Sequence, residues 1–158
     1  MYLTLMEIMQ GILVMTTKEY SIQIKEGCSL GVSLYIHGVN LDPMLVSEEL
    51  GLLPIRSHKK GYSRESPSGK VFVAKAGFWE FSTCSYVSTT EVNDHLEFLA
   101  ERICKTKKIS DINGVQEAFI GVYVGVDHDA YPTVEFDIKP NTLKKISAMN
   151  IPIKFTFA

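Results

Sequence analysis

A strict alternation of apolar and polar residues in "LGVSLYIH" (residues 30–37) is the feature that most constrains the fold. Successive side chains of a β-strand point to opposite faces, so this pattern predicts a strand with one apolar and one polar face. The apolar face carries Leu30, Val32, Leu34 and Ile36, and the polar face carries Ser33, Tyr35 and His37. Such a strand is typical of an antiparallel sheet that is covered on one side only.

Other segments also favour strands. The segment "IPIKFTF" (residues 151–157) alternates strictly, and its inward positions are expected to be Ile151, Ile153, Phe155 and Phe157. Four more strand-like segments are "YSIQIK" (20–25), which reads as an edge strand, "VFVAKAGFWEFSTCSYV" (71–87), "AFIGVYVGV" (118–126) and "TVEFDI" (133–138).

Three segments have helical signals. In the first, Asp42 is suited to cap the helix, Pro43 to begin it and Gly51 to end it. The second, residues 91–106, follows Thr90 as its cap and has an apolar stripe of Val92, Leu96, Leu99 and Ile103. The third, residues 142–149, follows Asn141 and is expected to turn Leu143, Ile146 and Met149 inward.

The order of these segments predicts an α+β fold, with a mainly antiparallel sheet, two or three helices packed on one face, and an elaborated ferredoxin-like arrangement. We expect residues 15–158 to form a single domain, because the length is typical of one domain and no long linker interrupts it. Residues 1–14 are interpreted as an extension upstream of a start at Met15. The alternative is a short amphipathic helix packed on the domain or on a second copy.

Composition indicates the cellular compartment and argues against nucleic-acid and membrane partners. The net charge of -2 lacks the basic excess of a nucleic-acid-binding domain, so no nucleic-acid partner is expected. The apolar start is interrupted by Glu7 and is too short to span a bilayer, so no membrane association is expected. The three cysteines, Cys28, Cys84 and Cys104, are widely spaced, which argues against a disulfide framework and favours a cytoplasmic protein.

The single tryptophan, Trp79, lies in "GFWEFS" and is interpreted as a core residue rather than as the wall of a pocket. Large aromatic side chains supply much of the stability of a small core. The residues predicted to form the core are Trp79, Phe81, Leu96, Leu99 and Phe155.

No residue pattern predicts a catalytic, metal or cofactor site. The histidines His37, His58, His95 and His128 include no i, i+4 pair and no HExxH motif. We interpret "DHD" (127–129) as a solvated turn and the cysteines as buried apolar residues. The segment "SPSGK" (66–70) lacks the earlier glycine of a phosphate-binding loop.

Two groups of charged residues are the candidates for partner binding. Residues 56–70, "RSHKKGYSRESPSGK", read as a loop or a loose hairpin rich in basic residues, among them Arg56, Lys59, Lys60 and Arg64. An acidic group of Asp127, Asp129, Glu135 and Asp137 is the candidate for meeting a basic partner. Charges of this kind steer association between proteins.

The order of several motifs resembles a known family. The motifs are "IHGVNLDP" (36–43), "VSEELGLLP" (46–54), "GFWEFST" (77–83), "DHLEFLAERI" (94–103) and "PNTLKKISAMNIPIKFTF" (140–157). Together they resemble the bacterial domain-of-unknown-function family 4279 over about residues 30–157. The resemblance implies a small soluble bacterial protein without established enzymatic activity, and some members look like immunity proteins of toxin systems.

The functional expectation is therefore a non-enzymatic protein-binding module whose partner is another protein, with a bacterial toxin as the partner that the resemblance suggests. The alternative is a small-ligand sensor or an enzyme, with a pocket beside the sheet formed by histidines and carboxylates. A homodimer that pairs through an edge strand, either residues 20–25 or residues 151–157, is a further possibility.

Overall fold

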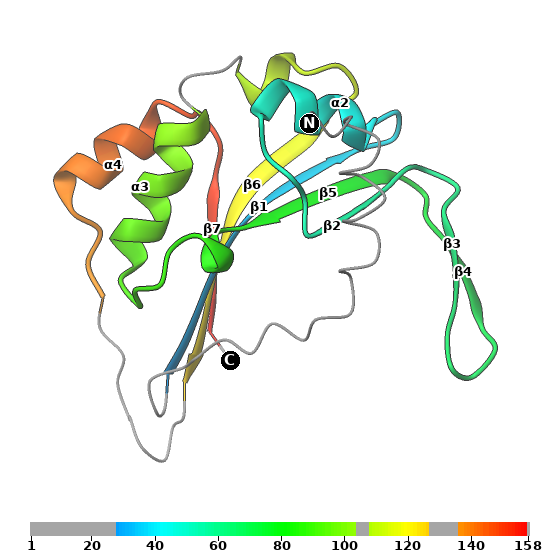
Figure 1. Cartoon of the computed structure of the whole chain (residues 1–158), viewed down its shortest axis with the longest axis horizontal. Coiled ribbons are helices and arrows are strands. Elements are labelled where there is room, and N and C mark those ends of the chain that lie inside the picture. Colours follow the sequence, from blue (N-terminus) through cyan, green and yellow to red (C-terminus); the bar gives the residue numbers. More distant parts are fainter. Residues whose placement is uncertain (1–27, 104–107, 127–135, 158) are drawn as a thin grey trace, which may run out of the picture.

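The computed structural model describes residues 28–103, 108–126 and 136–157, and these residues build a curved sheet with helices on one face (Figure 1). The five strands, in spatial order, are β2 (Arg56–His58), β5 (Gly77–Ser82), β1 (Cys28–Gly38), β6 (Glu117–Val126) and β7 (Ile153–Phe157). The central strand, β1, is antiparallel to both β5 and β6, whereas β7 is parallel to β6.

The described part of the chain contains three helices, α2 (Pro43–Leu50), α3 (Val92–Ile103) and α4 (Pro140–Ser147), and α4 packs beside α3. Short 3-10 turns lie at Thr83–Ser85 (η1) and Ile109–Asp111 (η2). A separate two-stranded sheet of β3 (Ser63–Glu65) and β4 (Val71–Val73) projects from the edge of the main sheet (Figure 1). The predicted α+β class with a mainly antiparallel sheet is confirmed.

The strand order departs from the ferredoxin-like arrangement, in which another strand separates the two strands of each β-α-β unit. Here β1 and β5 are antiparallel neighbours although α2 lies between them in the chain. Strands β6 and β7, which flank α4 in the chain, are direct parallel neighbours. The ferredoxin-like connection is therefore not observed.

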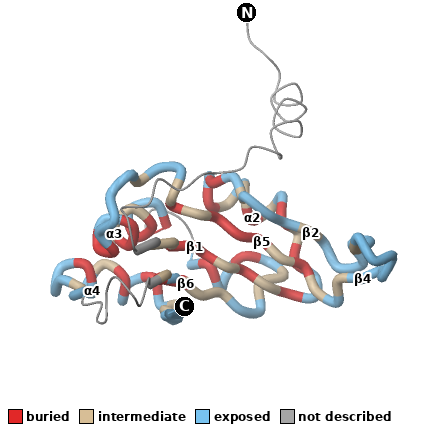
Figure 2. Tube along the Cα trace, turned by 90° about the horizontal axis from the view of Figure 1, so that it is seen from below, coloured by how far each residue is buried: buried red, intermediate tan, exposed pale blue. Residues whose placement is uncertain are grey.

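The core lies between the sheet and the helices. Cross-strand register places Ile36 opposite Trp79 and Leu34 opposite Phe81, so these side chains share the helix-covered face. Trp79, Phe81, Leu96 and Leu99 are fully buried, as the sequence pattern predicts. Figure 2 shows the buried positions concentrated in the central strands and the helices, and the projecting β3–β4 hairpin exposed along its length.

Phe155 does not belong to the buried core, which corrects the prediction. It pairs in register with the buried Val122, so its side chain does point to the helix side of the sheet. However, β7 is the last strand in the sheet order. Phe155 is therefore 38% exposed, although the Phe136 ring stacks on it at 5.6 Å between centroids. An alternating pattern predicts the face of a strand but not how far the covering helices reach.

The helix ends differ in how closely they follow the sequence signals. In α2, the carboxylate of Asp42 accepts a hydrogen bond from the backbone N–H of Met44, and Gly51 ends the helix in the left-handed conformation at φ 62°. In α4, the helix begins at Pro140, before the expected Asn141 cap. Thr142 and Ile146 are buried, whereas Leu143 is exposed, so the predicted inward position of Leu143 is wrong.

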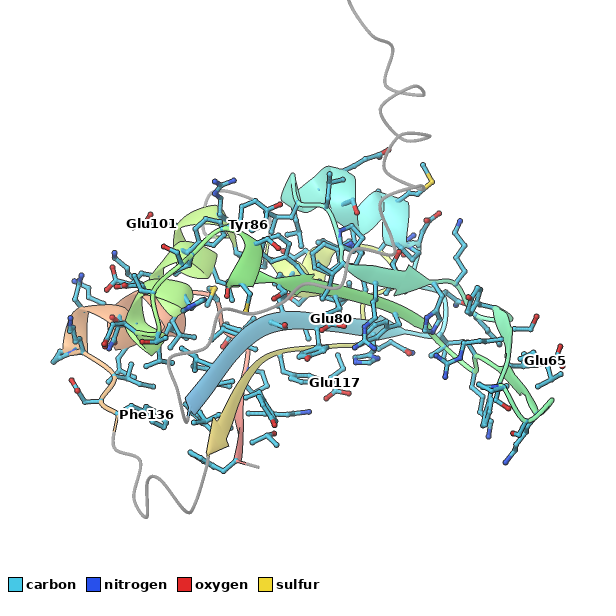
Figure 3. The ribbon with its side chains drawn as sticks, turned by 60° about the horizontal axis from the view of Figure 1, so that its bottom comes forward. Glu65, Glu80, Tyr86, Glu101, Glu117 and Phe136 are labelled. Atoms are coloured by element: carbon cyan, nitrogen blue, oxygen red, sulfur yellow. The ribbon has the colours of Figure 1, made fainter. Side chains whose placement is uncertain are left out.

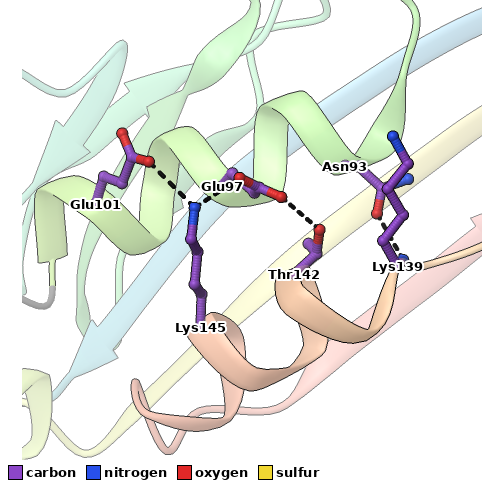
Figure 4. A network of polar contacts seen from close by, with 6 residues as sticks. All are labelled: Asn93, Glu97, Glu101, Lys139, Thr142 and Lys145. Carbon is purple, nitrogen blue, oxygen red and sulfur yellow. Dashed lines mark hydrogen bonds and ion pairs between the residues drawn. The ribbon is translucent and has the colours of Figure 1, made fainter.

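Polar contacts join α3 to α4 (Figure 4). The Glu97 carboxylate accepts hydrogen bonds from the Thr142 hydroxyl at 2.7 Å and from the Lys145 ammonium at 2.6 Å. Lys145 also contacts Glu101 at 3.2 Å. At the start of α4, the backbone N–H of Lys139 donates to the side chain of Asn93 at 2.9 Å. These contacts fix α4 against α3.

Several predicted segments fall partly or wholly outside the described residues. The extension 1–14 and the strand 20–25 lie outside them. Residues 136–138 of the predicted strand 133–138 are irregular. No helix in the described ranges combines the length and the apolar character needed to cross a bilayer.

Candidate functional site

The face of the sheet opposite α2, α3 and α4 carries two adjacent rows of aromatic and charged side chains. We call it the helix-free face, because no helix of the described residues covers it. Cross-strand register places the first row on four neighbouring strands, in the order Arg56, Glu80, Tyr35 and Phe119. The second row, two residues further along each strand, is His58, Phe78, His37 and Glu117. Figure 3 shows Glu117 on the side of the sheet away from α2. Side chains at these positions alternate with the core residues, which explains why both rows share one face.

The rings of these rows contact one another and form an aromatic ladder, defined here as Tyr35, His37, His58, Phe78 and Phe119. The ring of Tyr35 stacks on Phe119 with 5.0 Å between centroids. The Phe78 ring lies between two histidines, 5.0 Å from His37 and 5.4 Å from His58. Stacked and tilted aromatic pairs at these separations stabilise one another beyond their buried area.

A buried carboxylate lies within the ladder. Glu80 is only 4% exposed, and its Oε2 accepts a hydrogen bond from Arg56 Nε at 2.6 Å. Burial, and next the negative charge of Glu80, raise the pKa of the Tyr35 hydroxyl. The Tyr35 ring fits because Gly121 faces it, and a Cβ at position 121 would lie 2.6 Å from Tyr35 Cε2.

At the β6 end of the ladder, the side chain of Lys154 contacts Phe119. The ammonium of Lys154 lies 3.6 Å from the centroid of the Phe119 ring and 2.9 Å from a carboxylate oxygen of Glu117. A cation over an aromatic face is attracted by the ring quadrupole. Hydrogen bonding to Lys154 lowers the pKa of Glu117, so this carboxylate remains charged at neutral pH.

The basic segment of the sequence forms a projecting hairpin, named here the arm and defined as residues 59–75. Its strands β3 and β4 pair so that Arg64 lies opposite Phe72 and Ser63 opposite Val73. Further backbone bonds close its base, from Gly61 N–H to Ala74 C=O and from Ala74 N–H to Tyr62 C=O, each at 2.8 Å. No residue of the arm is buried.

One face of the arm continues the aromatic ladder. The Tyr62 ring stacks on His58 at 5.5 Å, and His58 in turn stacks on Phe78. Strand alternation places Tyr62, Arg64, Lys70 and Phe72 on the same face of the hairpin. The Lys70 ammonium lies 5.0 Å from the Phe72 ring centroid. Figure 3 shows Glu65 on the arm, away from the sheet.

The arm also concentrates positive charge. It contains five basic residues and one acidic residue, Glu65, and the basic residues are Lys59, Lys60, Arg64, Lys70 and Lys75. Lys59 forms an ion pair with Asp42 at 2.9 Å, which ties the base of the arm to the start of α2. Within the described residues, Lys60 and Arg64 form no ion pair.

The predicted basic residues therefore come together only in part. Lys59, Lys60 and Arg64 lie on the arm, whereas Arg56 lies on β2 and binds Glu80. Of the predicted acidic group, Asp127, Asp129 and Glu135 lie outside the described residues. Asp137 is exposed, and its backbone carbonyl accepts a hydrogen bond from the Asn93 side chain at 2.8 Å.

The described histidines lie in two places. His37 and His58 lie on the helix-free face, on either side of the Phe78 ring, whereas His95 of α3 is buried on the helix side of the sheet. One ring nitrogen of His95, Nε2, is 2.9 Å from the Thr89 carbonyl, and the other, Nδ1, is 2.6 Å from the Thr83 hydroxyl. Both nitrogens thus have structural partners. His128 lies outside the described residues.

Sequence reasoning missed the aromatic ladder. The signal was present, because Tyr35 and His37 occupy the polar face of the first alternating strand and Phe78 alternates with Trp79. The pattern does not reveal that three further strands place rings beside them, because the register between strands follows from the tertiary fold.

No curated protein and no solved structure matches the chain. Residues 26–157 match a family described as "Domain of unknown function (DUF4279)". This match spans most of the chain and includes every strand and helix described above. The chain therefore belongs to the DUF4279 family.

Proposed function

We propose that the protein is a non-enzymatic protein-binding module and that the arm, together with the adjoining end of the aromatic ladder, is its binding surface. The observation that carries this proposal is a run of exposed apolar side chains on a projecting hairpin that contributes nothing to the core. Val71, Phe72 and Val73 are 60%, 48% and 59% exposed. The partner would present an acidic surface.

The exposed run is unusual for a structural element. A two-stranded hairpin is marginally stable in water on its own, and the arm lacks a buried side chain that would anchor it. Its apolar side chains therefore gain a stabilising environment only when another surface covers them. Aromatic side chains and arginine are enriched in the centres of protein interfaces, and Tyr62, Arg64 and Phe72 supply both kinds on one face.

The charge of the arm supports an acidic partner surface. Lys60 and Arg64 are exposed, and a carboxylate on a partner would satisfy the guanidinium of Arg64 in a bidentate contact. Opposite charges also accelerate the encounter of two proteins, and this acceleration falls as salt screens the charges. Binding through the arm should therefore weaken at high ionic strength.

Within this class, we propose a bacterial toxin as the partner and the cytoplasm as the place of action. The support for a toxin is the resemblance to a family some of whose members look like immunity proteins, and the support for the cytoplasm is the small, odd number of cysteines. Products of genes beside the coding sequence are accordingly the first proteins to test as partners.

The test is affinity capture with three baits. These are the wild type, a variant with Arg64→Glu and Phe72→Ala in the arm, and a control with Leu143→Ala, which removes an exposed apolar side chain from α4 instead. We expect a protein that is captured by the wild type and the control in low salt and is lost with the arm variant. An identical set of captured proteins for all three baits contradicts the proposal.

A further inference from the structure

We propose that two copies of this chain pair through their β7 strands, antiparallel to each other, around a two-fold axis at Phe155. Strand β7 is the last in the sheet order and pairs with β6 on one side only. Joining two β7 strands would make one continuous sheet, with the helices of both copies on the same face. This surface is at the opposite edge of the sheet from β2 and the arm.

The backbone of β7 shows which groups are available for pairing. The N–H of Ile120 donates to the carbonyl of Pro152 at 2.9 Å, and Ile120 pairs in register with Ile153. In a parallel ladder, alternate residues direct both backbone groups to the same neighbour, so residues 154 and 156 face β6. Residues 153, 155 and 157 therefore direct their N–H and C=O groups to the outer edge. Among the described residues, no strand occupies that edge.

The sequence of β7 is self-complementary around Phe155. With the two-fold axis at this residue, Phe155 lies opposite its own copy, Ile153 lies opposite Phe157, and Lys154 lies opposite Thr156. All three outward residues then exchange hydrogen bonds with the second copy. An axis at Lys154 would place two lysines directly opposite each other, which is destabilising. A slip by one residue would turn apolar side chains against polar ones.

The side chains at this edge favour association. Phe136 stacks on Phe155 at 5.6 Å and on Phe157 at 6.1 Å, and all three phenylalanines are exposed. Pairing around Phe155 brings the two phenylalanine clusters together on the helix side of the sheet. This arrangement gives Phe155 the burial that a single copy does not provide.

The usual protection of an edge strand is weak here. Proteins commonly place a lysine on an edge to prevent pairing with another chain. Lys154 instead lies over the Phe119 ring and binds Glu117, so its charge is held against the helix-free face of its own sheet. Because β7 is only five residues long, we expect a reversible dimer whose population depends on concentration.

The first test is the mass of the full chain by sedimentation equilibrium, from low to high micromolar concentration. We expect the wild type to shift from monomer towards dimer, and Phe155→Lys to remain a monomer throughout. The matched control is Phe72→Lys, which also replaces an exposed phenylalanine but lies on the arm, and it should dimerise like the wild type. A monomeric wild type at every concentration, or a control that loses the dimer while Phe155→Lys retains it, would overturn the proposal.

A second pair of variants tests the register without removing an apolar side chain. Thr156 is exposed, and in the proposed dimer it lies opposite Lys154 of the second copy. Thr156→Glu should tighten the dimer several-fold and Thr156→Lys should weaken it several-fold, since each change alters two symmetric cross-strand pairs. Equal dissociation constants for these two variants would exclude the register centred on Phe155.

Discussion

At the scale of single residues, the indole of Trp79 joins the sheet to α2. Its Nε1–H donates to the Ser47 hydroxyl at 3.0 Å, and that hydroxyl in turn donates to the Pro43 carbonyl at 3.0 Å. Ser47→Ala would leave the buried N–H without its partner, at a cost of about 1–3 kcal/mol. Denaturant unfolding of Ser47→Ala, Trp79→Phe and the double variant measures the coupling. Strict additivity of the two single effects would show that the hydrogen bond contributes nothing.

Two glycines are required for different steric reasons. A Cβ at Gly121 would lie 2.6 Å from the Tyr35 ring, whereas a Cβ at Gly38 would lie 1.8 Å from the backbone oxygen of Gly114. We expect Gly121→Ala to cost about 1–3 kcal/mol, as overpacking commonly does, and to cost less in a Tyr35→Ala background. Gly38→Ala should cost more, because the backbone cannot rotate away. The free energies of unfolding of these variants decide this, and an equal cost of Gly121→Ala in both backgrounds would contradict the assigned clash.

At the scale of elements, the contact of α3 with α4 should depend on pH. The pKa of Glu97 is lowered, first by Lys145 and then by Thr142, and the pKa of Lys145 is raised by Glu97 and Glu101. A carboxylate with a lowered pKa stabilises the fold above its unfolded value of 4.5, and this contribution is lost as the pH falls through the folded pKa. The raised pKa of Lys145 stabilises below 10.5 and is lost as the pH rises through the folded value.

Glu97→Gln should therefore reduce the loss of stability on acidification. The glutamine side chain can still accept the Thr142 hydrogen bond, so the change removes mainly the charge. The measurement is urea unfolding at neutral pH and at a pH below the ordinary carboxyl pKa. The control is Glu101→Gln, whose carboxylate is more exposed and more distant from Lys145. If both variants show the acid sensitivity of the wild type, Glu97 is not the group responsible.

The elements also show what the sequence can predict and what it cannot. Helix α2 was predictable from end to end, because Asp42, Pro43 and Gly51 act through local backbone geometry. The inward face of α4 was predictable only in part. Ile146 and Met149 are buried as expected, but Leu143 is exposed and the polar Thr142 is buried. Thr142 is buried because Glu97, a residue 45 positions away, binds its hydroxyl. Residues 56–70 were predicted as a loop or a loose hairpin rich in basic residues. The pairing of Ser63–Glu65 with Val71–Val73 and the stacking of Tyr62 on His58 were not predicted.

At the scale of the whole molecule, the sheet separates its surfaces. The helices cover one face, the aromatic ladder lies on the other, and the arm and β7 are at opposite edges. Alternation within strands was sufficient to predict that one face is covered. The strand order and the parallel pairing of β7 depend on contacts between distant segments, which no local pattern contains.

The separation of the edges has a consequence for the proposed binding. A dimer formed through β7 would carry its two arms at the far ends of the continuous sheet. Two arms that engage a repetitive or dimeric partner at once would bind more tightly than one, without any new contact. Phe155→Lys should then weaken binding to such a partner while the affinity of the single arm, measured with a monomeric partner, stays the same.

The most direct test of the proposed binding surface is the dissociation constant for the captured partner, measured by calorimetry with the wild type and two variants. The central claim is that the arm is the binding surface. If it is correct, the arm variant with Arg64→Glu and Phe72→Ala weakens binding by about 30-fold or more, as the loss of interface hot spots does, and Leu143→Ala leaves the affinity nearly unchanged. An arm variant that binds as tightly as the wild type would contradict the claim.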